Sequence, residues 1–148
     1  MTTSEDPSPQ PIVVGIDGSE PSLHAVRWAA RQAELTGSPL EVVMTWEWPA
    51  SYGWPLPLPS EYDPAADAEK LVAEATAEVR KVHPDLEIRT RVVEGHPAPT
   101  LVEASRGADL LVVGSRGHGE FAGMLLGSVS EHCVTNAHCP VVVFRDRQ

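Results

Sequence analysis

Short apolar runs, rich in Val, Ile and Leu, alternate along this chain with segments whose apolar residues recur at helical spacing. The runs are predicted strands, and they cover residues 12–16, 40–46, 86–93, 109–113 and 141–144. Continuous apolar runs are typical of strands that are buried on both faces. Strands that alternate with helices favour a parallel sheet with helices on both sides. The sequence therefore predicts a Rossmann-like α/β fold with an open, five-stranded parallel sheet.

The helical segments carry their own start and stop signals. Ser19 can cap the first predicted helix, and Gly37 ends it. Asp63 opens the second helix, Pro97 begins a short third one, and Ser128 begins the fourth. Each expected helix thus falls between two expected strands, which makes the order of elements β-α-β-α-β-α-β-α-β.

Length and charge limit the class of protein. The 148 residues are the usual size of one domain, and we expect a disordered lead-in at 1–10 and a single domain over 11–146. With 11 basic and 21 acidic residues the net charge is −10, which disfavours binding to nucleic acids and to anionic membrane surfaces. No apolar run is long enough to span a bilayer. Two cysteines cannot form a disulfide framework, so a cytoplasmic location is expected.

Glycine and aspartate follow the first predicted strand. In open parallel sheets, ligands bind beyond the carboxyl ends of the strands, where the strand order reverses. Asp17 can accept hydrogen bonds there from ribose hydroxyls or an adenine amine, and Gly15 leaves room for a ligand. Each residue also fits a structural role, because Asp17 can form an Asx turn into the first helix and Gly15 can allow a tight helix–strand contact.

A second candidate segment follows the fourth predicted strand. Gly114 and Gly117 are followed, after nine further residues, by Gly127 and Ser128 at the expected start of a helix. Glycine lets the main chain approach a ligand closely, and a helix N-terminus has free amides and a partial positive charge. Together these features favour a phosphate-binding site.

Side chains of the same segment add to this interpretation. Ser128 and Ser130 supply hydroxyl donors, and Arg116 supplies a positive charge that the acidic chain otherwise lacks there. The alternative is a capping box, in which Ser128 and Glu131 satisfy the first helix amides without any ligand. The pattern alone leaves both interpretations open.

Several other motifs are excluded. The only lysines, Lys70 and Lys81, lie on the second predicted helix, so there is no Walker sequence. Four potential metal ligands gather near the end of the chain at His132, Cys133, His138 and Cys139. Their spacing is not that of a zinc site, and Cys133 is interpreted as a small buried residue. We assign no catalytic residue and no metal site.

Two long segments resemble the universal stress protein family. The first is VVGIDGSEPSLHAVRWA near the start, and the second is ADLLVVGSRGHGEFAGMLLGSVSEHCVTNAHCPVVVF, which is similar to the last third of the family. The similarity covers about residues 10–145, and the glycine spacing resembles the signature of the single-domain, ATP-binding branch. The resemblance implies strand order 3-2-1-4-5, with a cleft between the first and fourth strands. It also implies a regulatory role in the stress response and ATP as ligand, alone or with Mg²⁺.

The resemblance further implies residue roles. Asp17 and Gly15 would meet the adenosine part, and the main chain of Thr45 would meet adenine. The remaining nucleotide-binding residues would hold the phosphates: Gly114, Ser115, Arg116, Gly117, His118, Gly119, Gly127, Ser128, Val129 and Ser130. Members usually form homodimers through the last strand, here Val141, Val142, Val143 and Phe144. At the end of the second strand the family often has a histidine followed by alanine or valine, whereas this chain has Met44 and Thr45. The difference affects the part of the site that would contact adenine.

Two other functions stay open at this level. Slow ATP hydrolysis or adenylyl transfer would use the same cleft, although the sequence offers no clear carboxylate to activate water. A nucleotide-free scaffold would instead bind a protein through the connector at 47–63, which is rich in proline and aromatic residues. Long connectors of this kind are uncommon in compact domains, and this one is interpreted as either a surface flap or a functional loop.

Overall fold

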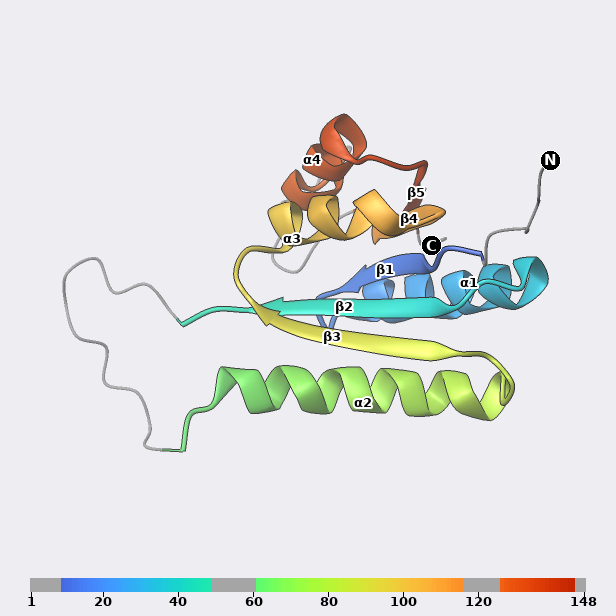
Figure 1. Ribbon diagram of the computed structural model, residues 1–148. Helices are drawn as coiled ribbons and strands as arrows, with labels where there is room; N and C mark the ends of the chain where they lie inside the picture. Colours follow the sequence, from blue (N-terminus) through green and yellow to red (C-terminus); the bar gives the residue numbers. More distant parts are fainter. Residues whose placement is uncertain (1–8, 49–60, 116–125, 146–148) are drawn as a thin grey trace.

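The computed structural model describes residues 9–48, 61–115 and 126–145 of the chain (Figure 1). The described strands form one parallel sheet in the order β3-β2-β1-β4-β5, which confirms the predicted fold class and strand order. Their bounds are β1 Ile12–Ile16, β2 Leu40–Trp46, β3 Ile88–Glu94, β4 Leu110–Gly114 and β5 Val141–Phe144. Strand β1 lies at the centre, between β2 and β4.

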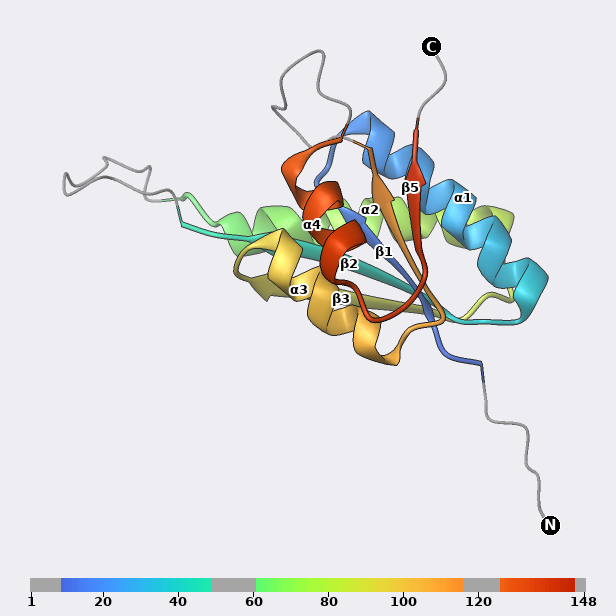
Figure 2. The same cartoon turned by 90° about the horizontal axis from the view of Figure 1, so that it is seen from above.

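Helices cover both faces of this sheet. Their bounds are α1 Glu20–Thr36, α2 Pro64–Val82, α3 Pro97–Ala104 and α4 Ser128–Asn136, with a short 3-10 turn, η1, at Ser105–Gly107. Helices α1 and α2 lie on one face, and α3 and α4 lie on the other, as the two perpendicular views show (Figures 1 and 2). The arrangement is therefore a three-layered α/β/α sandwich.

The described helices begin where the sequence predicts, and two of the side-chain caps form as expected. The Ser19 hydroxyl accepts a hydrogen bond from the Ser22 amide at 3.4 Å, and the Asp63 carboxylate accepts one from the Ala66 amide at 3.1 Å. Gly37 ends α1 with φ 73°, a left-handed conformation that glycine adopts without strain. Helix α4 begins at Ser128 as predicted, and its N-cap is Gly127, so Ser128 does not hold the N-cap position that the alternative of a capping box requires.

Two strands differ from the prediction at both ends: β3 covers Ile88–Glu94 and not 86–93, and β4 covers Leu110–Gly114 and not 109–113. Strand β3 begins at Ile88 and not at residue 86, because the amide of Leu86 donates to the carbonyl of His83 in a turn that follows α2. Strand β4 extends to Gly114, where it pairs with Phe144 of β5. Turn hydrogen bonds and strand pairing decide such boundaries, and neither is visible in the local apolar pattern.

Alternation along the central strand explains its continuous apolar run. Ile12, Val14 and Ile16 pack into a hydrophobic cluster with α1 and α2, whereas Val13 packs into a second cluster on the α3 and α4 face. Successive side chains of a strand point to opposite faces, so a strand covered on both faces needs apolar residues at every position. The buried core is thus divided by the sheet into two layers.

Part of what the sequence predicts lies outside the described residues. Residues 1–8, most of the predicted lead-in, are among them, as are 49–60 of the connector at 47–63. Within the described part of the chain, no helix combines the length and the apolar character needed to cross a membrane.

Two leucines allow a matched test of this core. Leu40 of β2 is 0% exposed, whereas Leu35 of α1 is 79% exposed. We expect Leu40→Ala to lower the free energy of unfolding by about 2–5 kcal/mol, because it leaves a cavity between packed layers. Leu35→Ala should change it by less than about 0.5 kcal/mol. Urea unfolding midpoints of the two variants check this, and equal losses would contradict the described burial of β2.

Candidate ligand-binding cleft

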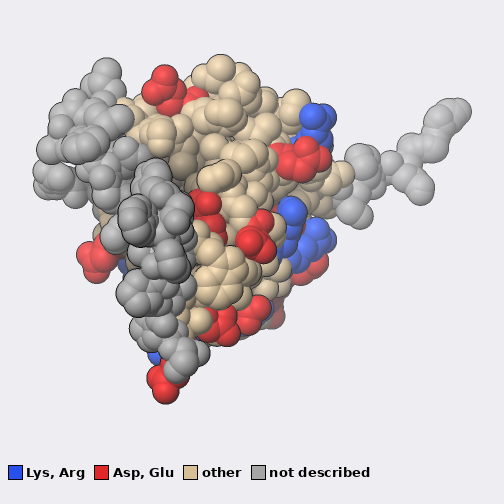
Figure 3. Space-filling model, turned by 90° about the vertical axis from the view of Figure 1, so that its left-hand side faces the viewer, with Lys and Arg blue, Asp and Glu red and all other residues tan. Residues whose placement is uncertain are grey.

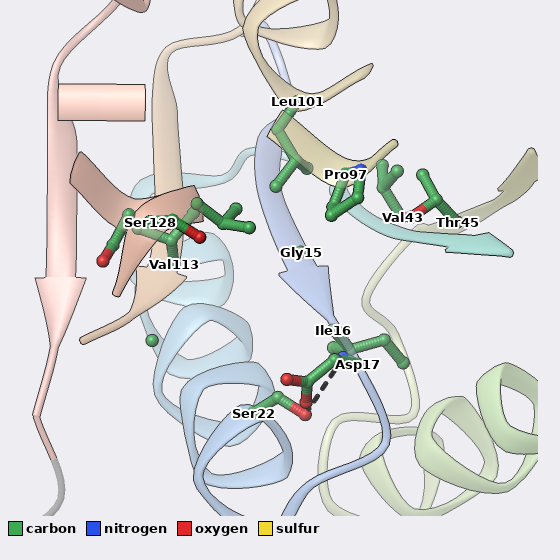
Figure 4. A pocket seen from close by; sticks show the side chains of 13 residues that line it. Gly15, Ile16, Asp17, Ser22, Val43, Thr45, Pro97, Leu101, Val113 and Ser128 are labelled. Atoms are coloured by element: carbon green, nitrogen blue, oxygen red, sulfur yellow. Dashed lines mark hydrogen bonds between the residues drawn. The ribbon is translucent and has the colours of Figure 1, made fainter. Parts of the chain in front are cut away.

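A cavity of about 320 Å³ lies at the carboxyl ends of the central strands (Figure 4). The strand order reverses there, because the chain runs from β1 to β2 on one side and later returns to β4 on the other. Its lining comes from β1, β2, β4 and from the starts of α1, α3 and α4, at Gly15, Ile16, Asp17, Ser22, Val43, Thr45, Pro97, Leu101, Val113, Gly114, Ser128, Val129 and Ser130. Such a switch point is where open α/β sheets bind their ligands.

Many of the predicted site residues meet in this cavity. Seven of the lining residues were predicted, and they come from four separate parts of the chain: Gly15, Asp17, Thr45, Gly114, Ser128, Val129 and Ser130. Two others, Ser115 and Gly127, are described and adjoin the lining without belonging to it. The remaining predictions, Arg116, Gly117, His118 and Gly119, lie outside the described residues.

Other lining residues were missed by the sequence analysis. Val43 precedes Thr45 by two positions, so strand alternation alone would have placed both side chains on one face. Pro97 and Leu101 are four residues apart on α3 and therefore share a helix face. The sequence carries these periodic signals, but it does not show that α3 lies over β1 and β2.

Asp17 forms the Asx turn that was the structural alternative. One carboxylate oxygen, Oδ1, accepts hydrogen bonds from the Ser19 amide at 2.9 Å and from the Ser19 hydroxyl at 2.5 Å. The Asp17 amide donates to the Ser22 hydroxyl at 3.3 Å (Figure 4). These bonds orient the carboxylate at the cavity edge, so the turn and a ligand-facing role are compatible.

Gly15 also has its structural role. A Cβ atom at this position would lie 2.7 Å from Cδ1 of Leu101, closer than real Cβ contacts, and 3.0 Å from Cδ2, which is a tight contact. Leu101 of α3 points toward Gly15 across the cavity wall (Figure 4). The absent side chain therefore lets α3 approach β1, and the same close approach shapes one wall of the cavity.

The opposite wall is the first turn of α4. Gly127 is the N-cap of this helix, and no side chain caps it, so the alternative of a capping box with Ser128 as the cap does not form. The hydroxyl of Ser130 lies 3.0 Å from the carbonyl oxygens of both Ser115 and Gly127, and it donates to them. The positive end of the α4 dipole thus faces the cavity through Ser128, Val129 and Ser130.

Charge at this end of the molecule is mainly negative. Figure 3 shows the end at which the strands terminate, with acidic side chains spread over it and most of the visible Lys and Arg gathered at one side. The described lining of the cavity contains no Lys or Arg, and its one acidic side chain is Asp17. Positive potential in the described part of the cavity therefore comes from main-chain amides and the helix terminus.

The cysteines behave as the sequence analysis expects for Cys133. This residue is fully buried on α4, and burial raises the pKa of its thiol to about 11. Burial and, to a smaller extent, the charge of Asp109 raise the pKa of Cys139. A raised pKa disfavours the thiolate, which is the form that binds metal. Over the described ranges, His, Cys, Asp and Glu form no group of three or more that could hold a metal ion.

A parallel α/β/α sandwich with a ligand-sized cleft at its switch point defines a class of Rossmann-like binding domains. Comparison with known proteins identifies the family within this class. The sequence pattern of the universal stress protein family matches residues 9–145, and the chain belongs to that family.

Curated relatives support the assignment. The chain is 36% identical over 148 residues to the universal stress protein Rv2624c of Mycobacterium tuberculosis (strain ATCC 25618 / H37Rv), a match that covers 99% of this chain and 52% of the relative. It is 40% identical over 144 residues to Rv2623 of the same strain, which covers 91% of this chain and 47% of the relative. The chain therefore spans about half the length of the curated relatives it matches.

Solved structures share the fold. A crystal structure of a universal stress protein in complex with cAMP has TM-score 0.68 and 32% identity, and the match covers 91% of this chain and 95% of that one. A universal stress protein from Archaeoglobus fulgidus has TM-score 0.69 and 24% identity, with 91% and 93% of the two chains covered. The second match is evidence for the fold alone.

The contact between Gly15 and Leu101 can be tested with two glycines. We expect Gly15→Ala to lower the free energy of unfolding by about 1–3 kcal/mol, because the new methyl group overlaps Leu101 and forces it to move. Gly107→Ala is the control, since a Cβ there would meet nothing within 4 Å. Denaturant unfolding measures both losses, and a crystal structure of Gly15→Ala should show Leu101 displaced. Equal effects of the two substitutions would contradict the close approach.

Proposed function

We propose that this chain binds an adenine nucleotide, ATP in particular, in the cavity at the carboxyl ends of β1 and β4, and that it acts as a regulatory protein of the stress response. The observation that carries the proposal is the convergence of seven predicted site residues on this one cavity. The 32% identical universal stress protein in complex with cAMP supports an adenine nucleotide as the ligand class.

The residues that line the cavity can bind the base, the ribose and the phosphates of an adenine nucleotide in different regions. Apolar side chains of Val43, Leu101 and Val113 line one region, and a flat base gains free energy by burial against surfaces of this kind. Asp17 can accept hydrogen bonds from ribose hydroxyls or from the adenine amine. The main chain at the start of α4 offers donors to the phosphates.

The glycine spacing supports ATP over a nucleoside. Gly114, Gly127 and Ser128 lie where β4 ends and α4 begins, on the side of the cavity with positive potential. A polyphosphate next to an acidic body needs countercharge beyond one helix terminus. We assign that countercharge to Arg116, which is outside the described residues, and to Mg²⁺ bound together with ATP.

Two aspartates provide a matched test of the site. Asp17 and Asp63 each precede a helix and accept a main-chain hydrogen bond, but only Asp17 lines the cavity. We expect Asp17→Asn to weaken ATP binding about tenfold, because hydrogen bonds to a charged acceptor contribute about 1.5–3 kcal/mol. Asp63→Asn should leave the affinity unchanged. Isothermal titration with ATP, with and without Mg²⁺, and with cAMP and GTP measures the affinities.

The results separate the parts of this proposal. No binding of any adenine nucleotide by the wild-type chain would overturn the function itself. Equal affinities of Asp17→Asn and Asp63→Asn would overturn the placement of the ligand beside β1. Equal affinities for GTP and ATP would show that the site does not recognise adenine specifically.

We further propose a homodimer through β5, the strand at the sheet edge. The carbonyls of Pro140 and Phe144 accept hydrogen bonds from β4, so in the alternating pattern of a parallel pair Val142 also faces β4. The main-chain groups of Val141 and Val143 then point away from the sheet, where a second copy can pair with them. Among the described strands β4 alone pairs with β5, and an apolar edge strand favours pairing with a second copy.

A proline substitution tests this edge. We expect Val143→Pro to give a monomer, because proline lacks the amide that points toward the partner, while the bonds between β4 and β5 persist. Val143→Ala is the control, since it keeps the amide and should remain a dimer. Sedimentation equilibrium measures the association state. A wild-type monomer at micromolar concentration, or a dimer of Val143→Pro, would contradict the proposed interface.

A further inference from the structure

Ser130 has a hydrogen-bonding role that its sequence position does not reveal. Its side chain is 2% exposed, in the first turn of α4, and yet it belongs to the lining of the cavity. The hydroxyl oxygen lies 3.0 Å from the carbonyl of Gly127, one turn back, and 3.0 Å from the carbonyl of Ser115, at the end of β4. One hydroxyl therefore links the end of β4 to the first turn of α4, across a separation of 15 residues in the sequence.

The number of protons limits what this hydroxyl can do. A serine hydroxyl has a single proton to donate, and here two carbonyl oxygens share it. Phosphate oxygens at neutral pH are also acceptors. Ser130 can therefore donate to a phosphate only by giving up its bonds to the main chain, which differs from the donor role predicted from the sequence.

The same junction is held by two further bonds. The amide of Gly127 donates to the carbonyl of Ser115 at 2.6 Å, and the amide of Ser115 donates to the carbonyl of Phe144 at 2.8 Å. The carbonyl of Ser115 thus receives two donors, which occupy both of its lone pairs. Strands β4 and β5 and the start of α4 are fixed together at this point.

We propose that Ser130 is a positioning residue of the nucleotide site: its hydroxyl sets the distance between the end of β4 and the first turn of α4, and it does not bind the ligand. The inference rests on the proposed function. It applies to the phosphate side of the cavity, because the elements that Ser130 links carry the main-chain donors there.

The loss of this hydroxyl should loosen the junction without unfolding the chain. In Ser130→Ala the carbonyl of Ser115 keeps the amide of Gly127 as a donor, and the carbonyl of Gly127 keeps the amide of Glu131 at 2.9 Å. No buried carbonyl is left without a partner, which avoids the largest cost of removing a hydrogen bond. The effect should therefore appear in geometry and ligand affinity.

The experiment combines two measurements on the full chain. Amide hydrogen exchange at Gly127, measured by NMR without ligand, reports the junction itself. Isothermal titration with ATP, AMP and adenosine reports whether any loss of affinity depends on phosphate. The variants are Ser130→Ala, Ser130→Thr, which retains a hydroxyl, and Ser105→Ala. Ser105 is the control because it is a buried serine with main-chain bonds outside the cavity.

We expect Ser130→Ala to speed exchange at Gly127 and to weaken ATP and AMP about tenfold, a change of about 1.4 kcal/mol. Adenosine affinity should stay the same, Ser130→Thr should restore much of the loss, and Ser105→Ala should affect no ligand. An equal loss for all three ligands would show a merely structural role and overturn the inference. Weaker ATP binding with unchanged exchange would show direct donation to the phosphate and overturn it as well.

The same measurements distinguish a failure of the proposed function from a failure of the role assigned to Ser130. If the wild-type chain bound none of the three ligands, both the function and the role of Ser130 in it would be wrong. If it bound them and Ser130→Ala changed neither measurement, the inference alone would be wrong.

Discussion

The pairing of β1 with β2 on one side and with β4 on the other is the constraint on which the cleft depends. Because all strands are parallel, their carboxyl ends lie at the same edge of the sheet. The strand order reverses at β1, so the loops that follow β1 and β4 lead away from each other. The cavity occupies the space between them. The two hydrophobic layers hold this pairing in register, since the central strands are apolar at nearly every position.

Structural roles and the proposed ligand-facing roles fall on the same residues at the cleft. Asp17 orders the turn into α1 with one carboxylate oxygen and still lines the cavity. Gly15 admits Leu101 and, by doing so, shapes a wall. The sequence analysis set these roles against each other as alternatives, but a binding site built from main chain and short side chains needs both, because the same bonds that shape the turn also orient the groups exposed to the ligand.

Charge favours a helix terminus as the anion-binding part of the proposed site. The chain has a net charge of −10, and the described lining of the cavity has no basic side chain. Main-chain amides are donors that need no positive side chain, and their direction is set by the helix. The direction of these amides depends on how α4 is placed, and the junction of Ser115, Gly127 and Ser130 fixes the start of this helix against the end of β4.

The sequence by itself determined the elements, and it predicted seven of the residues that line the cavity. Local signals are sufficient for this: apolar runs define the strands, Ser19 and Asp63 cap helices, and glycines after strands mark close approach. Only the tertiary structure decided which helix faces reach the cleft. Leu101 and Ser22 line it, and the Ser130 hydroxyl turns to main-chain carbonyls, because contacts between distant segments determine these arrangements. The sequence shows which residues are apolar and which can donate a hydrogen bond. Which partner each of them contacts depends on how the helices and the sheet pack in three dimensions.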